Sequence, residues 1–138
     1  MAKGHPYAIP LTQLRSVGMR PTRQRLALAK LLFDGNNRHI TAEMLHGEAI
    51  EARVRVSLAT VYNTLHQFTR VGLLNEIVVD SGSSYFDTNT SNHHHFYCED
   101  TRELTDIDGK DIKFGRLPKA PVSKEISGVD VVVRIRSS

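Results

Sequence analysis

The most constraining feature of this 138-residue chain is a change of hydrophobic period at Gly72. Before Gly72, apolar residues recur at helical spacing behind Ser57, a residue type that favours the N-cap of a helix. After it, residues 74–79 and 84–88 alternate on either side of the turn-forming stretch 80–83. The pattern predicts a helix of about four turns followed at once by a two-stranded ribbon. The apolar helix positions are Leu58, Val61, Leu65 and Phe68.

Three shorter helices are expected before this one. The first ends at Gly18, the second runs from Arg23 to Phe33 behind the cap Thr22, and the third begins at Thr41. Their expected buried positions are Leu11, Leu14 and Val17, then Leu26, Leu28, Ala29, Leu32 and Phe33, then Met44, Leu45 and Ala49. Helices in this order followed by a ribbon indicate a winged helix-turn-helix.

The second part of the chain is richer in strand signals. Short strands are expected at residues 94–98, 103–107 and 129–135, with a weaker candidate at 111–117 and a loop around Pro118 and Pro121. We therefore expect an α+β protein: a winged-helix DNA-binding domain over residues 1–90 and a small α/β domain over residues 91–138. The second domain is too thin to be stable alone, so it is expected to form a homodimer and to carry the sensing site.

Composition narrows the class of protein. A single cysteine, Cys98, excludes an internal disulfide framework and a structural zinc site made of four cysteines. No apolar run is long enough to cross a membrane, and the first residues lack the apolar core of a signal peptide. A cytoplasmic protein without a membrane partner is therefore expected.

Charge is divided unevenly between the two halves. Residues 1–72 contain ten Lys and Arg against four Asp and Glu, whereas residues 73–138 contain eight against eleven. The basic half is the one with the predicted winged helix, which favours a polyanionic partner such as double-stranded operator DNA.

The predicted long helix offers side chains suited to reading DNA. In a winged helix, the second helix of the helix-turn-helix lies in the major groove. Tyr62 can pack on thymine methyl groups and Asn63 can pair with adenine, while basic residues before the second helix suit phosphates. The expected DNA-binding residues are Arg20, Arg23, Ser57, Thr60, Tyr62 and Asn63.

Three adjacent histidines, His93, His94 and His95, follow the predicted ribbon. In a strand, His93 and His95 share one face and His94 points to the other, so the triplet can serve two different sites. Imidazole binds iron, zinc, copper and haem iron, and the aromatic residues that follow offer apolar surface to a porphyrin. The triplet is therefore a candidate haem-binding site.

A second candidate site uses only one member of the triplet. His39 before the third helix and Asp87 at the end of the ribbon could join His95 around one divalent ion, either Mn, Fe or Zn. Cys98 is expected to be a small buried residue rather than a ligand. His5, in the stretch Gly4-His5-Pro6, is accessible to haem iron but is expected to belong to a frayed terminus.

Several of these segments together resemble the ferric-uptake-regulator family over nearly the whole chain. They are residues 18–25 (GMRPTRQR), 39–43 (HITAE), 57–65 (SLATVYNTL) and 93–95 (HHH). Residues 85–89 (YFDTN) and 129–136 (VDVVVRIR) most resemble the iron response regulator (Irr) branch of that family.

The resemblance implies a haem-responsive transcriptional regulator, mainly a repressor, of genes for iron and haem homeostasis. Such a homodimer binds operator DNA under iron limitation and loses DNA affinity on binding haem, which an enzyme of haem synthesis delivers. The resemblance also matches Arg20 to a minor-groove position, His39, Asp87 and His95 to metal ligands, and the His triplet to the haem-responsive site.

Departures from the family pattern keep an alternative open. The paired cysteines of zinc-stabilised members are absent, and Gly4-His5-Pro6 stands where some relatives carry a Gly-Cys-Pro haem motif. The alternative is a repressor that depends on a divalent metal. A metalloenzyme is the third hypothesis, and it is disfavoured because no glutamate general base accompanies the histidines in the His-Glu-x-x-His manner.

Overall fold

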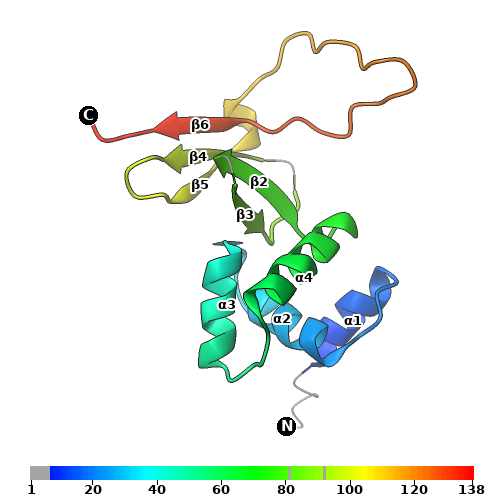
Figure 1. The fold of residues 1–138 in the computed structure, drawn as a ribbon. Helices are drawn as coiled ribbons and strands as arrows, with labels where there is room; N and C mark the ends of the chain where they lie inside the picture. Colours follow the sequence, from blue (N-terminus) through cyan, green and yellow to red (C-terminus); the bar gives the residue numbers. More distant parts are fainter. Residues whose placement is uncertain (1–6, 81, 92) are drawn as a thin grey trace, which may run out of the picture. The chain divides into compact units, whose positions relative to one another are not determined.

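A computed structural model describes residues 7–80, 82–91 and 93–138 of the chain. The chain divides into two compact units, Met1–Thr90 and Ser91–Ser138, whose elements are labelled in Figure 1. The stretch Gly4-His5-Pro6 lies outside the described residues, so its expected role stays a prediction.

The described residues of the first unit form four helices. They are α1 (Ala8–Ser16), α2 (Arg23–Phe33), α3 (Ala42–Glu51) and α4 (Leu58–Arg70). The last three begin behind an extended residue whose hydroxyl accepts a hydrogen bond from the amide three positions later: Thr22, Thr41 and Ser57. The caps Thr22 and Ser57 were predicted from the sequence, and the third helix was predicted to begin at Thr41, because capping depends on neighbouring residues.

One core joins the four helices to the sheet of the first unit. Its fully buried members include Leu14, Leu28, Leu45, Leu65, Phe68 and Phe86. The prediction that Met44 is buried was wrong, since Met44 is 47% exposed. Leu58, the first residue of α4, is 36% exposed. Ala42, Leu45 and Ala49 define the buried side of α3, and Met44 lies about 100° from Leu45 around the helix axis.

The ribbon after α4 forms as expected and gains a third strand. Gly72, at φ +85°, adopts the left-handed conformation that ends α4 and turns the chain into β2 (Asn75–Asp80). Strand β2 pairs with β3 (Ser83–Asp87), which also pairs with the short strand β1 (His39–Ile40). The strand order β1-β3-β2 places His39 directly opposite Asp87.

The second unit is a three-stranded sheet in the order β5-β4-β6. Its strands are β4 (His94–Cys98), β5 (Leu104–Ile107) and β6 (Val132–Ile135), with a 3-10 turn, η1, at Gly109–Asp111. The strand expected at 111–117 was wrong, since no regular structure follows η1 until β6 among the described residues. The last strand begins at Val132 rather than Val129, because only residues 132–135 pair with β4.

The four helices and two small sheets give the α+β class, with a winged helix-turn-helix in the first unit. None of the helices in residues 7–80, 82–91 and 93–138 combines the length and apolarity needed to span a bilayer.

Candidate DNA-reading face and metal ligands

The outer face of α4 is available for contact with another molecule. Ala59 and Asn63 are exposed, and Tyr62 is half-buried, while Val61, Leu65 and Phe68 pack into the core. The Ser57 hydroxyl accepts from the Thr60 amide and donates to the Thr60 hydroxyl at 2.9 Å. Both hydroxyls therefore rigidify the N-terminus of α4, which is the part of the helix that the sequence predicted to contact DNA.

A polar groove of about 270 Å³ lies between the start of α2 and the outer face of α4. Its lining comprises Thr22, Gln24, Arg25, Thr60, Asn63, Thr64 and Gln67. Arg25 spans the two helices: it donates to the Arg20 carbonyl at 2.9 Å and to Gln67 Oε1 at 3.2 Å. Arg20 and Arg23 are both exposed, and they flank Thr22 of the groove in the sequence. The structure thus brings Arg25 of α2 to the same groove as Asn63 of α4.

Tyr62 is held by a residue that sequence reasoning missed. Its hydroxyl donates to Glu43 Oε1 of α3 at 2.7 Å. The hydrogen bond to Glu43, partial burial and the negative charge of Glu43 together raise the pKa of Tyr62. Glu43 belongs to the family-like segment 39–43, but its pairing with Tyr62 could not be predicted, because that pairing depends on how α3 packs against α4.

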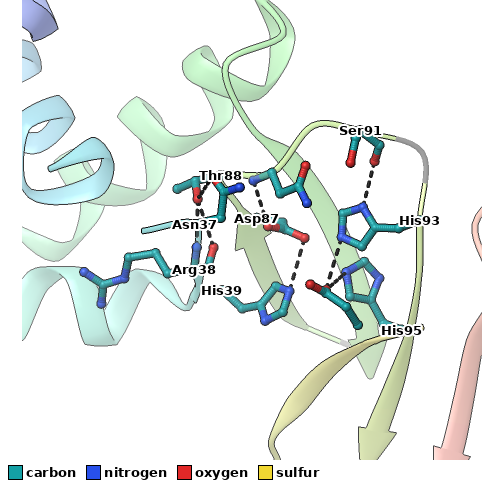
Figure 2. A network of polar contacts seen from close by, with 10 residues as sticks. Asn37, Arg38, His39, Asp87, Thr88, Ser91, His93 and His95 are labelled. Carbon is teal, nitrogen blue, oxygen red and sulfur yellow. Dashed lines mark hydrogen bonds and ion pairs between the residues drawn. The ribbon is translucent and has the colours of Figure 1, made fainter. Parts of the chain in front are cut away.

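Two side chains of types that can bind a metal ion lie close together in the first unit. His39 Nε2 lies 3.2 Å from Asp87 Oδ2, and the other carboxylate oxygen of Asp87 accepts from the Asn89 amide at 2.9 Å (Figure 2). Strand pairing explains this geometry, since β1 and β3 place His39 and Asp87 in register. Asp87 is buried and His39 is partly so. A buried acid beside an imidazole is one half of an N/O ligand set.

The second unit gathers two histidines around one carboxylate, so that it offers three further candidate metal ligands. His93 Nε2 and His95 Nε2 lie 3.2 and 3.4 Å from the same oxygen of Asp106 on β5. The ring nitrogens and this oxygen lie within 4.8 Å of one another. Cross-strand pairing brings Asp106 opposite His95, and the two-residue period puts His93 on the same face, with ring centroids 4.6 Å apart.

The tautomer of His93 is fixed by its backbone partner. Its Nδ1 lies 2.7 Å from the carbonyl oxygen of Ser91 (Figure 2), and a carbonyl only accepts, so Nδ1 carries the proton. The Nε2 atom is then the one that can donate a lone pair to a cation. This is the arrangement in which an outer hydrogen bond orients a metal-binding histidine.

His94 lies on the opposite face of β4, as the alternation predicted. Its Nδ1 accepts from the Val131 amide at 3.1 Å, and its ring meets Phe114 edge to face with centroids 5.4 Å apart. The His triplet is therefore divided: two members join Asp106 and one packs under the segment that leads to β6. Cys98 lies at the far end of β4, three positions beyond His95.

Asp106 was the ligand that the sequence did not reveal. The residues expected to bind metal were His39, Asp87 and His95, and those expected to bind haem were His93, His94 and His95. The alternation of side chains along β4 does not reveal which residue of β5 lies opposite His95. That pairing depends on the register of the two strands, which is set by the turn at residues 99–103. The proposed roles of all these residues in binding remain predictions.

Comparison with known proteins identifies the family. The sequence profile of the Ferric uptake regulator family matches residues 16–127. The Peroxide-responsive repressor PerR of Staphylococcus epidermidis is 33% identical over 103 residues, which cover 75% of this chain and 68% of that protein. The PerR of Staphylococcus aureus is likewise 33% identical, over 75% of this chain and 69% of its own length.

Solved structures of ferric uptake regulators share the fold of this chain. The ferric uptake regulator from Pseudomonas aeruginosa with manganese superposes with a TM-score of 0.72 at 25% identity, over 94% of this chain and 98% of that one. The Vibrio cholerae ferric uptake regulator (Fur), at 24% identity, shares the fold with a TM-score of 0.70 over 91% of this chain and 98% of its own. This chain belongs to the ferric uptake regulator family.

Proposed function

We propose that this protein is a transcriptional regulator that binds operator DNA as a homodimer, with an affinity set by a divalent metal ion. The observation that carries the proposal is the gathering of His93 and His95 around Asp106, in a chain whose winged-helix unit holds its own His39–Asp87 pair. We propose no catalytic activity, since the relatives are named as repressors and regulators.

DNA binding is supported by the first unit alone. Arg25 links α2 to α4 and lines the groove together with Asn63, while Arg20 and Arg23 are exposed near the start of α2. Basic residues that contact phosphates provide affinity, whereas side chains of the reading helix provide sequence preference. The surplus of ten basic over four acidic residues in positions 1–72 agrees with this division of roles.

The donor atoms fit a divalent transition metal. Imidazole nitrogens and carboxylate oxygens together suit manganese, iron and zinc, and none of the candidate ligands is a thiolate. The Pseudomonas aeruginosa relative is described with manganese. A bound ion would supply positive charge that holds the acidic and imidazole side chains together.

We further propose that the two ligand sets serve one ion. His39 and Asp87 are two ligands and the Asp106 set is three, so each is small for a metal that commonly takes four to six. His93 follows Asp87 by six positions in the chain, a reach of at most about 20 Å even when fully extended. One ion binding both sets would restrict the motion of the reading helix relative to the second unit, which would couple metal to DNA affinity.

Selection of duplexes from a randomised library by the manganese-loaded protein tests DNA binding. We expect one enriched sequence with internal two-fold symmetry, as a homodimer requires. Asn63→Ala should weaken binding to the enriched duplex by about 1–3 kcal/mol while barely changing binding to unrelated DNA. Enrichment of no duplex, or equal loss on all duplexes, would contradict a reading role for α4.

Metal titration of variants tests the shared site. Isothermal calorimetry with Mn²⁺ and Zn²⁺ should give one strong ion per chain for the wild type. His39→Ala and Asp106→Asn should each weaken that same binding event by at least about tenfold. Two independent events, each removed by only one of the variants, would mean that the ligand sets act separately.

Haem is the second candidate effector, favoured by the His triplet and by the Irr-like segments at 85–89 and 129–136. His94 is the member that takes no part in the Asp106 set, and the Phe114 ring beside it offers apolar surface to a porphyrin. In a haem titration of the protein bound to the enriched duplex, a Soret band accompanied by dissociation of the protein from the DNA would support haem sensing. His94→Ala should abolish both effects and leave Mn²⁺ binding intact, and a Soret band with unchanged DNA affinity would exclude haem as the effector.

A further inference from the structure

The side chain of Tyr62 is held from two sides on the face of α4. Its hydroxyl donates to Glu43 on α3, at 2.7 Å. Its ring stacks on the His66 imidazole one helical turn later, with centroids 6.3 Å apart and planes 18° apart. Tyr62 is half-buried and the next residue, Asn63, is exposed. The two contacts therefore fix a side chain at the protein surface and not one in the core.

His66 is in turn held by the wing, the ribbon formed by β2 and β3. Its Nδ1 lies 3.8 Å from Glu76 Oε1 of β2, and its ring meets the edge or face of Phe86 of β3 at 80°, with centroids 5.6 Å apart. Phe86 is fully buried and cannot move without disturbing the core. The stack that supports Tyr62 is therefore anchored in the rigid part of the first unit.

We infer that Glu43 and His66 are positioning residues that set the base preference of Tyr62. This inference rests on the proposed function, because it assigns a task on DNA to the face around Tyr62. A tyrosine on an open helix face samples several rotamers, and holding its ring in one of them before binding reduces the entropy lost on contact with a base. A ring fixed in place also distinguishes base pairs that a mobile ring would accept alike.

The charge of Glu43 favours a role in discrimination over a role in affinity. A carboxylate close to a DNA-facing side chain repels phosphates, so it weakens binding to every duplex to a similar extent. Glu43 is exposed, and a stabilising contact at this site would not require a negative group. Its benefit lies in the strong acceptor that it offers to the Tyr62 hydroxyl.

We call Glu43 and His66 the Tyr62 clamp. Each member is connected to a segment that carries one residue of the His39–Asp87 pair. Glu43 lies in the first turn of α3, directly after β1 with His39, and Phe86 immediately precedes Asp87 on β3. The segments that carry His39 and Asp87 thus lead into Glu43 and provide Phe86, the buried ring that His66 contacts.

The test measures base discrimination by full-length, manganese-loaded protein. The probe is the duplex that the wild type enriches from a randomised library, together with a panel in which each base pair is changed in turn. Glu43→Ala and Tyr62→Phe should each reduce discrimination at the same position by roughly fivefold. The double variant should lose no more than either single variant, because both remove one contact.

Conservative variants separate positioning from simple stabilisation. Glu43→Gln keeps an acceptor and removes the charge, so it should retain discrimination and bind unrelated DNA more tightly at low salt. His66→Phe keeps a ring beside Tyr62 and should retain discrimination, whereas His66→Ala should lose it. Glu51→Ala, on the exposed end of α3, is the matched control and should behave like the wild type.

The inference is overturned if Tyr62→Phe and His66→Ala both discriminate like the wild type while Tyr62→Ala does not. It is also overturned if the losses from Glu43→Ala and Tyr62→Phe add in the double variant. Tyr62→Phe removes a single oxygen, so the test stands even if Glu43→Ala folds poorly. Failure of the wild type to enrich any duplex overturns the proposed function and this inference together, whereas enrichment with unaltered discrimination in the variants overturns the inference alone.

Discussion

At the scale of single residues, the turn after β4 changes the chemistry of the one thiol. The Thr101 hydroxyl and the amides of Thr101 and Asp100 hydrogen-bond the sulfur and lower the pKa of Cys98. A larger thiolate fraction at neutral pH means faster alkylation, since the thiolate is the nucleophile. Thr101→Val should slow the reaction of Cys98 with iodoacetamide at pH 7, while Thr101→Ser should not. Equal rates for the three proteins would show that the hydroxyl does not act on the thiol.

Asp100, two residues after Cys98, makes a contact with Ser137 that is expected to weaken in acid. The Ser137 amide donates to Asp100 Oδ2 at 2.6 Å, and this bond together with the Ser137 hydroxyl lowers the pKa of Asp100. A carboxyl whose folded pKa lies below its unfolded pKa stabilises the fold above the unfolded value, and this stabilisation is lost as pH falls through the folded value. An NMR titration of the Asp100 carboxyl carbon should give a midpoint below the ordinary range of about 3.9. Ser137→Pro removes both donors and should return the midpoint to that range, and an unchanged midpoint would refute the assignment.

At the scale of elements, the N-caps predict measurable stability. The Thr41 hydroxyl accepts from the Met44 amide at 3.1 Å and starts α3 directly after the strand that carries His39. Thr41→Ala should lower the free energy of unfolding by about 1 kcal/mol, because an amide of the first turn loses its partner. Urea denaturation measures this change, and Thr41→Ser, which keeps the hydroxyl, should be close to the wild type. A fully stable Thr41→Ala protein would mean that solvent replaces the cap.

Local signals in the sequence predicted most of these elements. The caps Thr22, Thr41 and Ser57 and the end of α4 at Gly72 depend on neighbouring residues, so their positions follow from residue type and spacing. The strand β1 was missed, because two residues carry no periodicity and their strand character comes only from pairing with β3. Most of the candidate ligands could be named, but the contact between Asp106 and His95 depends on a register that no local pattern fixes.

At the scale of the whole molecule, the proposed ion links metal binding to stability. An ion that binds only the folded chain raises the free energy of unfolding by about 2.7 kcal/mol when its free concentration is one hundred times its Kd. Calorimetric scans should therefore show a higher Tm with Mn²⁺ or Zn²⁺ than with chelator. His95→Ala should lose most of this increase, and an equal increase in that variant would place the ion elsewhere.

The central claim is that a divalent ion held by these side chains controls DNA binding by the winged-helix unit. The most direct measurement is the fluorescence anisotropy of the enriched duplex titrated with protein, in chelator and in Mn²⁺, at one fixed salt concentration. We predict that Mn²⁺ strengthens binding by at least about tenfold in the wild type, a coupling of about 1.4 kcal/mol, and by less than twofold in His39→Ala and Asp106→Asn. Equal affinity of the wild type with and without the metal would contradict the claim.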